Sequence, residues 1–244
     1  MPQQPQWKMA LDVERCIGCH ACSVACKVEN QVPLGSFRTK VYYWDHGSYP
    51  QVKRDFLPAL CMQCEDAPCL KACKSGALSR GADGIVRIAQ HACDSHGACE
   101  KACPYGAISC QPGQIADKCD FCSHRLDVGM EPACVETCPA EVFHFGDARD
   151  PDSAYSRFMA RRGHETAVLK ADKGTRPAVA YRGHRVEMEA KIPEGRNHEG
   201  WSYEIETWPS LDAHFPPQRR VHWARVEPGQ NITEYRAEAE GGAA

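Results

Sequence analysis

The sequence predicts an α+β fold in which short helices and small hairpins surround bound inorganic groups instead of one large apolar core. Three observations support this prediction. Fifteen of the sixteen cysteines fall into four blocks between Cys16 and Cys138. The runs between the blocks are short, strand-like and bounded by turn residues. The 244 residues also lack the long apolar runs that a conventional core of that size requires.

The spacing within the blocks is that of thiolate ligands for iron-sulfur clusters. The blocks read Cys16-x2-Cys19-x2-Cys22-x3-Cys26, Cys61-x2-Cys64-x4-Cys69-x3-Cys73, Cys93-x2-His96-x2-Cys99-x3-Cys103 and Cys119-x2-Cys122-x11-Cys134-x3-Cys138. Three close cysteines let a loop curl around one cluster, and the cysteine after x3 lies on the following helical turn, where it can bind a second cluster. This crossing of ligands predicts tandem two-cluster modules of the bacterial-ferredoxin type.

Disulfides and zinc are the other common uses of many cysteines. Disulfides would imply a secreted chain, but residues 1–12 show no signal peptide, which argues against the ordinary secretory route. Bare Cys-x2-Cys pairs could form a zinc-binding structural module, but the repeated three-plus-one spacing favours clusters. The zinc module stays an alternative to be tested by colour and metal content.

Several function classes are disfavoured by composition. No run of eighteen apolar residues is present, so no transmembrane helix is expected. A formal charge of −3 gives no reason to expect nucleic acid as a partner. There is no nucleophile, base and acid set, no phosphate loop and no dinucleotide fingerprint, so the chain is not expected to be catalytic by itself.

Outside the blocks the sequence predicts short strands and one helix. Alternating apolar residues predict a strand within residues 1–12. Asp150-Pro151 is expected to cap a helix over 152–162 that Gly163 ends. Further strands are expected at Arg38–Trp44 and Gln51–Leu57, which form a hairpin around the turn 45–50, and at 85–88 and 178–181.

The blocks divide the chain into four parts. Residues 1–60 and 110–150 form an outer ferredoxin-like module with the first and fourth blocks, and residues 61–109 form an inner module. Residues 151–182 are a helix-strand extension. Residues 183–244 carry isolated aromatics without helical or alternating period. They are interpreted as an extended arm that binds a partner subunit.

The motifs and their order resemble the four-cluster iron-sulfur subunits of the dimethyl sulfoxide reductase family of molybdopterin oxidoreductases. The resemblance covers roughly residues 7–182. It includes the segments Cys16-Ile-Gly-Cys-His-Ala-Cys, Leu60-Cys-Met-Gln-Cys, Lys118-Cys-Asp-Phe-Cys, Pro132-Ala-Cys-Val-Glu-Thr-Cys-Pro139 and Gly174-Thr-Arg-Pro177.

The resemblance implies four ligand sets. They are Cys16, Cys19, Cys22 and Cys138 for the first cluster; Cys26, Cys119, Cys122 and Cys134 for the second; Cys61, Cys64, Cys69 and Cys103 for the third; and Cys73, Cys93 and Cys99 with His96 for the fourth. Three 4Fe-4S clusters are therefore expected. The first would face the catalytic subunit, and the fourth would lie at the far end.

His96 leaves the type of the fourth cluster open. Some relatives carry a bulky residue here and hold a 3Fe-4S cluster, whereas an imidazole nitrogen can itself bind iron in a 4Fe-4S cluster. Either outcome is expected to raise the potential. Cys110 lies outside the blocks. It is expected to be a small buried residue, and it is the spare thiol if histidine does not bind.

The chain is thus interpreted as the electron-transfer subunit of a molybdenum or tungsten oxidoreductase of anaerobic respiration. The expected partners are a molybdopterin-containing catalytic subunit and a membrane quinone-reactive subunit, a haem protein or a soluble carrier. A free-standing soluble polyferredoxin is the alternative. The resemblance is closest to subunits of enzymes that act on sulfur compounds. Subunits of enzymes that act on arsenate or phenolic substrates are the next most similar. The complex is expected at the membrane, either in the periplasm by export with a twin-arginine partner or in the cytoplasm.

Overall fold

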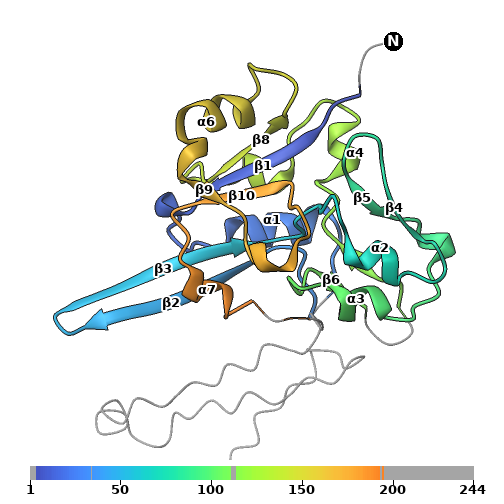
Figure 1. Cartoon of the computed structure of the whole chain (residues 1–244), viewed down its shortest axis with the longest axis horizontal. Coiled ribbons are helices and arrows are strands. Elements are labelled where there is room, and N and C mark those ends of the chain that lie inside the picture. Colours follow the sequence, from blue (N-terminus) through green and yellow to red (C-terminus); the bar gives the residue numbers. More distant parts are fainter. Residues whose placement is uncertain (1–3, 34, 111–113, 193, 195–244) are drawn as a thin grey trace, which may run out of the picture. The chain divides into compact units, whose positions relative to one another are not determined.

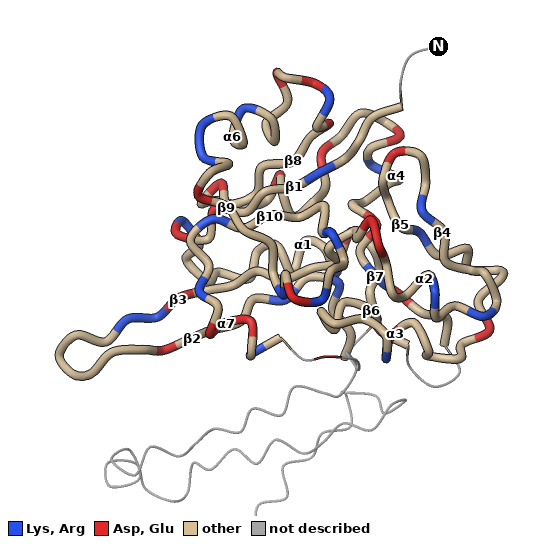
Figure 2. Tube along the Cα trace, in the orientation of Figure 1, with Lys and Arg blue, Asp and Glu red and all other residues tan. Residues whose placement is uncertain are grey.

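The computed structural model describes residues 4–33, 35–110, 114–192 and 194. All of them belong to one unit, Met1–Trp201, and the second unit, Ser202–Ala244, lies outside the described residues. Most of the expected partner-binding arm therefore lies outside the described part as well. Acidic and basic positions are interspersed over the described helices, strands and loops (Figure 2), in keeping with the small net charge.

The largest sheet has four strands in the order β8-β1-β10-β9 (Figure 1). Strand β1 (Trp7–Asp12) lies between β8 (Phe143–Asp147), to which it is antiparallel, and β10 (Val179–Arg182), to which it is parallel. The short strand β9 (Thr166–Ala167) pairs with β10 at the edge. The sheet thus joins a strand that precedes the first cysteine block to three strands that follow the last one.

Strand β1 is buried on both faces, not on the single face that alternation predicts. Residues 9–11 have no exposed surface. The register places Met9 opposite Phe145 and Val179, so these three side chains share one face of the sheet. That face meets the cysteine-bearing segments, where Phe121 contacts Phe145 edge-on with ring centroids 5.3 Å apart.

Helix α6 (Ala154–Arg162) covers the other face of the sheet (Figure 1). The ring of Phe158 on this helix stacks on His144 of β8, with centroids 4.1 Å apart. The helix and its end at Gly163 are confirmed. This helix explains why a strand with an alternating sequence is buried on both sides.

The predicted cap of α6 was wrong. The N-cap is Ser153, whose hydroxyl accepts a hydrogen bond of 3.1 Å from the backbone N–H of Ser156. The Asp150 carboxylate instead accepts a bond of 2.9 Å from the N–H of Asp152. Asp150 and Pro151 therefore form the turn before the helix, because the nearer hydroxyl satisfies the free N–H groups of its first turn.

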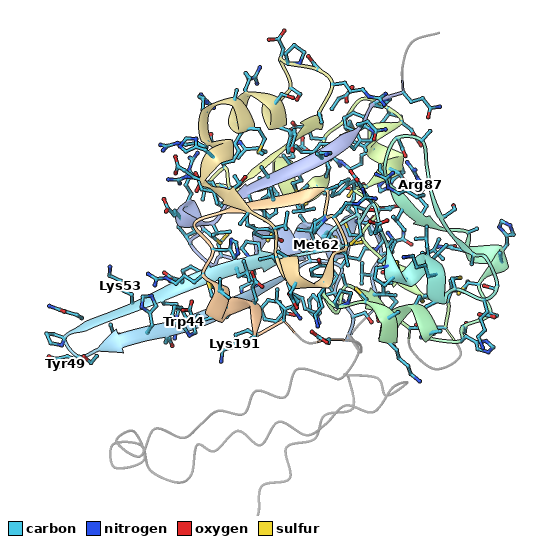
Figure 3. All side chains as sticks on the ribbon, viewed as in Figure 1. Trp44, Tyr49, Lys53, Met62, Arg87 and Lys191 are labelled. Atoms are coloured by element: carbon cyan, nitrogen blue, oxygen red, sulfur yellow. The ribbon has the colours of Figure 1, made fainter. Side chains whose placement is uncertain are left out.

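The predicted hairpin is confirmed, and it is longer than the sequence indicates. Strands β2 (Lys40–Ser48) and β3 (Gln51–Ala59) pair along their whole lengths, which leaves only Tyr49 and Pro50 in the turn. Polar residues extend the ladder by pairing across the strands, as Arg54 does with Asp45 at 2.5 Å. The end of the hairpin is exposed, with Tyr49 at 92 % (Figures 1 and 3).

Two smaller hairpins lie near the inner blocks. One is formed by β4 (Leu78–Arg80) and β5 (Val86–Ile88), and the other by β6 (Ile108–Ser109) and β7 (Asp117–Lys118). The fully buried Gln63 ties them to the blocks, since its amide donates to the Cys119 carbonyl and accepts from the Val86 N–H, both at 2.8 Å. Met62 beside it lies in the interior (Figure 3).

Short helices complete the unit. They are α1 (Ala21–Glu29), α2 (Pro68–Ala72), α3 (Ala98–Ala102), α4 (Ser123–Leu126) and α5 (Ala133–Glu136), with 3-10 turns at Val13–Arg15, Gln90–Ala92, Gly163–Glu165 and Ala171–Lys173. Within the described ranges, no helix is long and apolar enough to cross a membrane. The mixed helix and strand content agrees with the predicted α+β class.

The first residues of the expected arm are not extended. Helix α7 (Val186–Glu189) follows β10, and its Met188 is 1 % exposed. Ile192 is also buried, and its carbonyl accepts a 3.1 Å hydrogen bond from the Lys170 ammonium. The prediction that the chain is extended from residue 183 onward was therefore wrong for these first residues, because the side chains of Met188 and Ile192 are buried in the unit.

Candidate functional site

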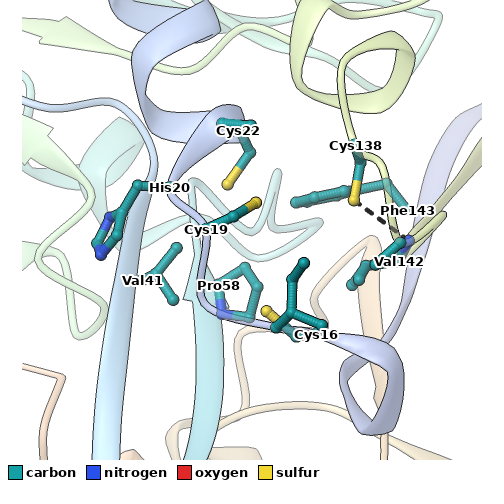
Figure 4. Close-up of a pocket in the computed structure, with 12 residues that line it drawn as sticks. Cys16, Cys19, His20, Cys22, Val41, Pro58, Cys138, Val142 and Phe143 are labelled. Atoms are coloured by element: carbon teal, nitrogen blue, oxygen red, sulfur yellow. Dashed lines mark hydrogen bonds between the residues drawn. The ribbon is translucent and has the colours of Figure 1, made fainter.

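Four thiols of the first and fourth blocks surround one hollow (Figure 4). Cys16, Cys19 and Cys22 come from the first block and Cys138 from the fourth, and the hollow has about 300 Å³ of atom-free space, part of it open to solvent. The packing of α1 against α5 brings these two distant blocks together. This group, the first site, is the set that the resemblance assigns to the first cluster.

The loop of the first site depends on a glycine. Gly18 has a left-handed φ of +68°, and a Cβ at this position would overlap the Phe56 ring from β3. Beyond the loop, the Val142 N–H donates a 3.4 Å hydrogen bond to the Cys138 sulfur (Figure 4). His20 lines the hollow, but its imidazole bonds to the Tyr43 hydroxyl. The ring is therefore held on the hairpin side of the hollow and not by a cysteine.

The inner blocks form the third site. Cys61, Cys64, Cys69 and Cys103 line a hollow with about 340 Å³ of atom-free space, and packing of α2 against α3 brings the two blocks together. The Ala107 N–H donates to the Cys103 sulfur at 3.5 Å. The same four-residue spacing joins Val142 to Cys138, and in both cases the cysteine precedes a proline that turns the chain.

The second site is formed by thiols of the first and fourth blocks that lie deeper in the unit. Its members, Cys26, Cys119, Cys122 and Cys134, are all buried. The amide nitrogen of Asn30 lies 3.6 Å from the sulfurs of both Cys26 and Cys122. Burial raises the pKa of Cys134 well above its ordinary value, and the thiolates of Cys26 and Cys122 add to the rise.

The fourth site combines the second and third blocks. Cys73, Cys93, Cys99 and His96 line a hollow with about 280 Å³ of atom-free space. Burial raises the pKa of Cys99 to about 11, and the largest contribution from a neighbouring charge is that of Cys110. Cys110 also lines this hollow. The sequence correctly predicts that Cys110 is buried, but no local pattern places it at this site.

Burial raises the pKa of several of the block thiols. It raises the pKa of Cys22, Cys64 and Cys69 to about 12 and that of Cys26 to about 11. Cys73 is an exception, because hydrogen bonds from Ser75 and three backbone N–H groups outweigh its burial and lower its pKa. Thiols of raised pKa become thiolates when metal cations supply the opposite charge.

The charge effects between cysteines of different sites show which sites are neighbours. After burial and the thiolates of its own site, Cys22 of the first site raises the pKa of Cys134 in the second. Cys61 of the third site also raises the pKa of the buried Cys119 of the second, and Cys99 of the fourth raises the pKa of Cys69 of the third. The sites therefore follow one another from first to fourth.

A buried lysine lies between the second and third sites. Lys118 is 3 % exposed, and its ammonium donates to the carbonyls of Cys119, at 2.8 Å, and of Val86. Its charge acts to lower the pKa of Cys69 and Cys103, against the larger effect of burial. The lysine directly before Cys119 was visible in the sequence, but its burial was not.

The donor sets suit polynuclear clusters. Thiols supply soft anionic ligands for iron, and nearby N–H groups donate to sulfur. Within the described residues, no three or more His, Cys, Asp or Glu converge on one position for a single ion. At three of the sites the ligands instead stand around hollows with about 280 to 340 Å³ of atom-free space, part of which is open to solvent.

Comparison with known proteins identifies the same chemistry. A 4Fe-4S dicluster domain matches residues 52–148, and a 4Fe-4S binding domain matches residues 7–28. These matches show that the chain contains ferredoxin-like domains for several 4Fe-4S clusters.

Three relatives extend the similarity over most of the chain. A tetrathionate reductase subunit of Salmonella typhimurium is 40 % identical over 73 % of this chain and 72 % of its own length. A putative dimethyl sulfoxide reductase iron-sulfur subunit of Halobacterium salinarum is 37 % identical over 71 % of this chain and 77 % of its own length. The arsenate respiratory reductase iron-sulfur subunit of a Shewanella species is 32 % identical over 71 % of this chain and 94 % of its own length. The chain therefore belongs to the family of electron-transferring iron-sulfur subunits of molybdopterin oxidoreductases and is not itself the catalytic subunit.

Proposed function

We propose that the chain relays single electrons through four iron-sulfur clusters, one at each site, between a molybdopterin-containing catalytic subunit and a second redox partner. Each bound cluster supplies one-electron chemistry. The protein holds the clusters in order, excludes water from the inner ones, and sets their potentials through burial, charge and N–H donors. Family membership favours this subunit role over a free-standing polyferredoxin.

The observation that carries the proposal is the gradient of burial along the sites. All eight cysteines of the second and third sites are buried, whereas Cys16, Cys19 and Cys138 of the first and Cys73 and Cys93 of the fourth are partly or fully exposed. Electrons tunnel only over short distances, so external partners need access at the ends and shielding in the middle. The two end sites are the natural points of entry and exit.

The proposed ligands are the fifteen cysteines of the four blocks, and the fourth site takes one further ligand, either His96 or another residue of its lining. We assign 4Fe-4S clusters to the first three sites. The first and second sites, with residues 1–60 and 110–150, would form the outer ferredoxin-like module, and the third and fourth sites would lie mainly in residues 61–109. Residues 151–182 supply α6 and β10, which close the sheet over the outer module.

The relatives suggest the class of substrate. Their names specify tetrathionate, dimethyl sulfoxide and arsenate reductases. We therefore propose a catalytic partner that acts on a small sulfur-containing compound or a related oxyanion, and that binds next to the first site. A membrane quinone-reactive subunit, a haem protein or a soluble carrier would exchange electrons at the fourth site. The complex would lie at the membrane.

Iron analysis with spectroscopy of the full chain tests the proposal. Protein purified without oxygen should be brown, with broad absorption near about 400 nm, and should contain about 15 or 16 iron atoms per chain. A colourless zinc protein, or about 12 iron atoms or fewer in fully loaded material, would contradict four clusters. Redox titrations of the isolated chain and of the complex would then be compared. The clusters whose potentials change when the partners bind are those of the end sites.

A further inference from the structure

A fourth cysteine lies at the fourth site. Cys110 directly follows β6 and lines the same hollow as Cys73, Cys93 and Cys99. It is 7 % exposed, so its thiol is directed to the interior and not to solvent. Three block cysteines and one cysteine from outside the blocks therefore surround one space.

The thiol of Cys110 touches the loop of the third block. Its sulfur lies 3.7 Å from the carbonyl oxygen of Ser95, and a Cβ on Gly97 would lie 3.9 Å from it. Ser95 and Gly97 both have left-handed φ, 58° and 68°. The sulfur thus approaches the two residues on either side of His96, in the loop where a regular block presents its second thiolate.

The imidazole of His96 has a different partner. Its Nδ1 lies 3.1 Å from the carboxylate of Asp94, and the two side chains are 64 % and 42 % exposed. The backbone N–H of His96 also donates to the Asp94 carboxylate at 3.3 Å. Asp94 therefore holds the histidine at the surface, while the buried thiol of Cys110 faces the hollow.

We propose that Cys110, not His96, supplies the fourth ligand of the fourth cluster. This inference rests on the proposed function, in which that site holds a cluster. On binding, the Cys110 thiol gives its proton to solvent and its sulfur forms one bond to the corner iron, without a change of oxidation state. Four thiolates then retain four irons, so the site holds a 4Fe-4S cluster and His96 lies outside the coordination sphere.

Measurements on the unaltered full chain test the proposal without any variant. Oxidised protein should lack the isotropic electron paramagnetic resonance signal of a 3Fe-4S cluster near the free-electron value. Pulsed resonance of the reduced clusters should show no strong coupling to an imidazole nitrogen. A stoichiometric 3Fe-4S signal, or a coupling that disappears in His96→Ala, would overturn the assignment.

Two variants then separate the residues. His96→Ala should leave the iron content and spectra unchanged. Cys110→Ala should produce the 3Fe-4S signal at about one spin per chain and lose about one iron, and Cys110→Ser should do the same to a lesser extent. Loss of iron in His96→Ala, or four intact 4Fe-4S clusters in Cys110→Ala, would refute the proposal. Unchanged spectra of the other three clusters serve as the folding control.

Failure of this inference is distinguishable from failure of the proposed function. If the fourth site holds no cluster, the unaltered chain contains about 12 iron atoms, and neither variant changes that number. If His96 is the ligand, the chain contains about 16 iron atoms and only His96→Ala alters the fourth cluster.

Discussion

The side-chain amide of Asn30 lies 3.6 Å from the sulfur of Cys122 and equally far from that of Cys26. Its oxygen accepts a hydrogen bond of 2.8 Å from Arg38, which directs the NH2 group to the sulfurs. Arg38 is held in turn by Asp117 at 2.6 Å. A single amide therefore bridges thiols from the first and fourth blocks, and it is positioned by a half-buried ion pair.

Replacing this donor should lower the potential of the second cluster. N–H donors to the ligand sulfurs favour the reduced, more negative cluster. Loss of one hydrogen bond of about 1 kcal/mol corresponds to roughly 40 mV for one electron. In a redox titration followed by electron paramagnetic resonance, Asn30→Ala should shift one cluster downward by about this amount, with the exposed Gln31→Ala as control. Equal potentials in both variants would show that the amide does not tune the cluster.

Removing the buried charge of Lys118 should have a larger effect. A cation near a cluster stabilises its reduced form, and in a protein interior such an interaction is on the order of 2 kcal/mol, or about 100 mV for one electron. Lys118→Met should therefore lower the potentials of the second and third clusters by roughly 50 to 100 mV. Lys53→Met, on the exposed hairpin, is the matched control and should change neither (Figure 3). A shift confined to the first or fourth cluster would argue against the position described for Lys118.

Removal of iron should unfold most of the described unit. Ligand sulfurs form much of the interior, and the space between them stays unfilled without clusters. Cluster binding then supplies the free energy that a small apolar core does not. After chelation under reducing conditions, circular dichroism should decrease and a protease should cut throughout residues 16–138. Restoring iron and sulfide should reverse both changes, whereas a protease-resistant apoprotein would contradict the prediction.

The sequence predicts what depends on local spacing and misses what depends on contacts between distant segments. Cysteine spacing identifies the blocks, and turn residues mark the hairpin, because both signals lie within a few residues. The order β8-β1-β10-β9 is invisible because its strands are far apart in sequence. Asn30, Lys118 and Cys110 were missed or left without a site for the same reason: each gains its role from a segment that only folding brings near.

Acid should loosen helix α6 through His144. Burial between the sheet and Phe158 lowers the pKa of His144, and its Nε2 has no hydrogen-bond partner in the described region. The unfolded chain then binds the proton more readily than the folded one. The stability that depends on the neutral ring is therefore present above the ordinary pKa of about 6.5 and is lost as pH falls toward the lower, folded value.

Amide exchange of residues 154–162, corrected for intrinsic rates, measures this loss. Protection of the helix should decrease between about pH 7 and pH 5. His144→Phe should remove the pH-dependent part, and the exposed His91→Gln should retain it. If protection in His144→Phe still follows pH as in the unaltered protein, another group is responsible.

The pairing of β1 also constrains when the protein can mature. This strand leaves the ribosome before every other described strand, yet both of its neighbours are translated after Cys138. The first site likewise waits for Cys138 to emerge. Nascent chains that stop short of this residue can complete neither the first site nor the sheet, so the cellular machinery that delivers iron and sulfide can finish this site only after more than half of the polypeptide has been translated.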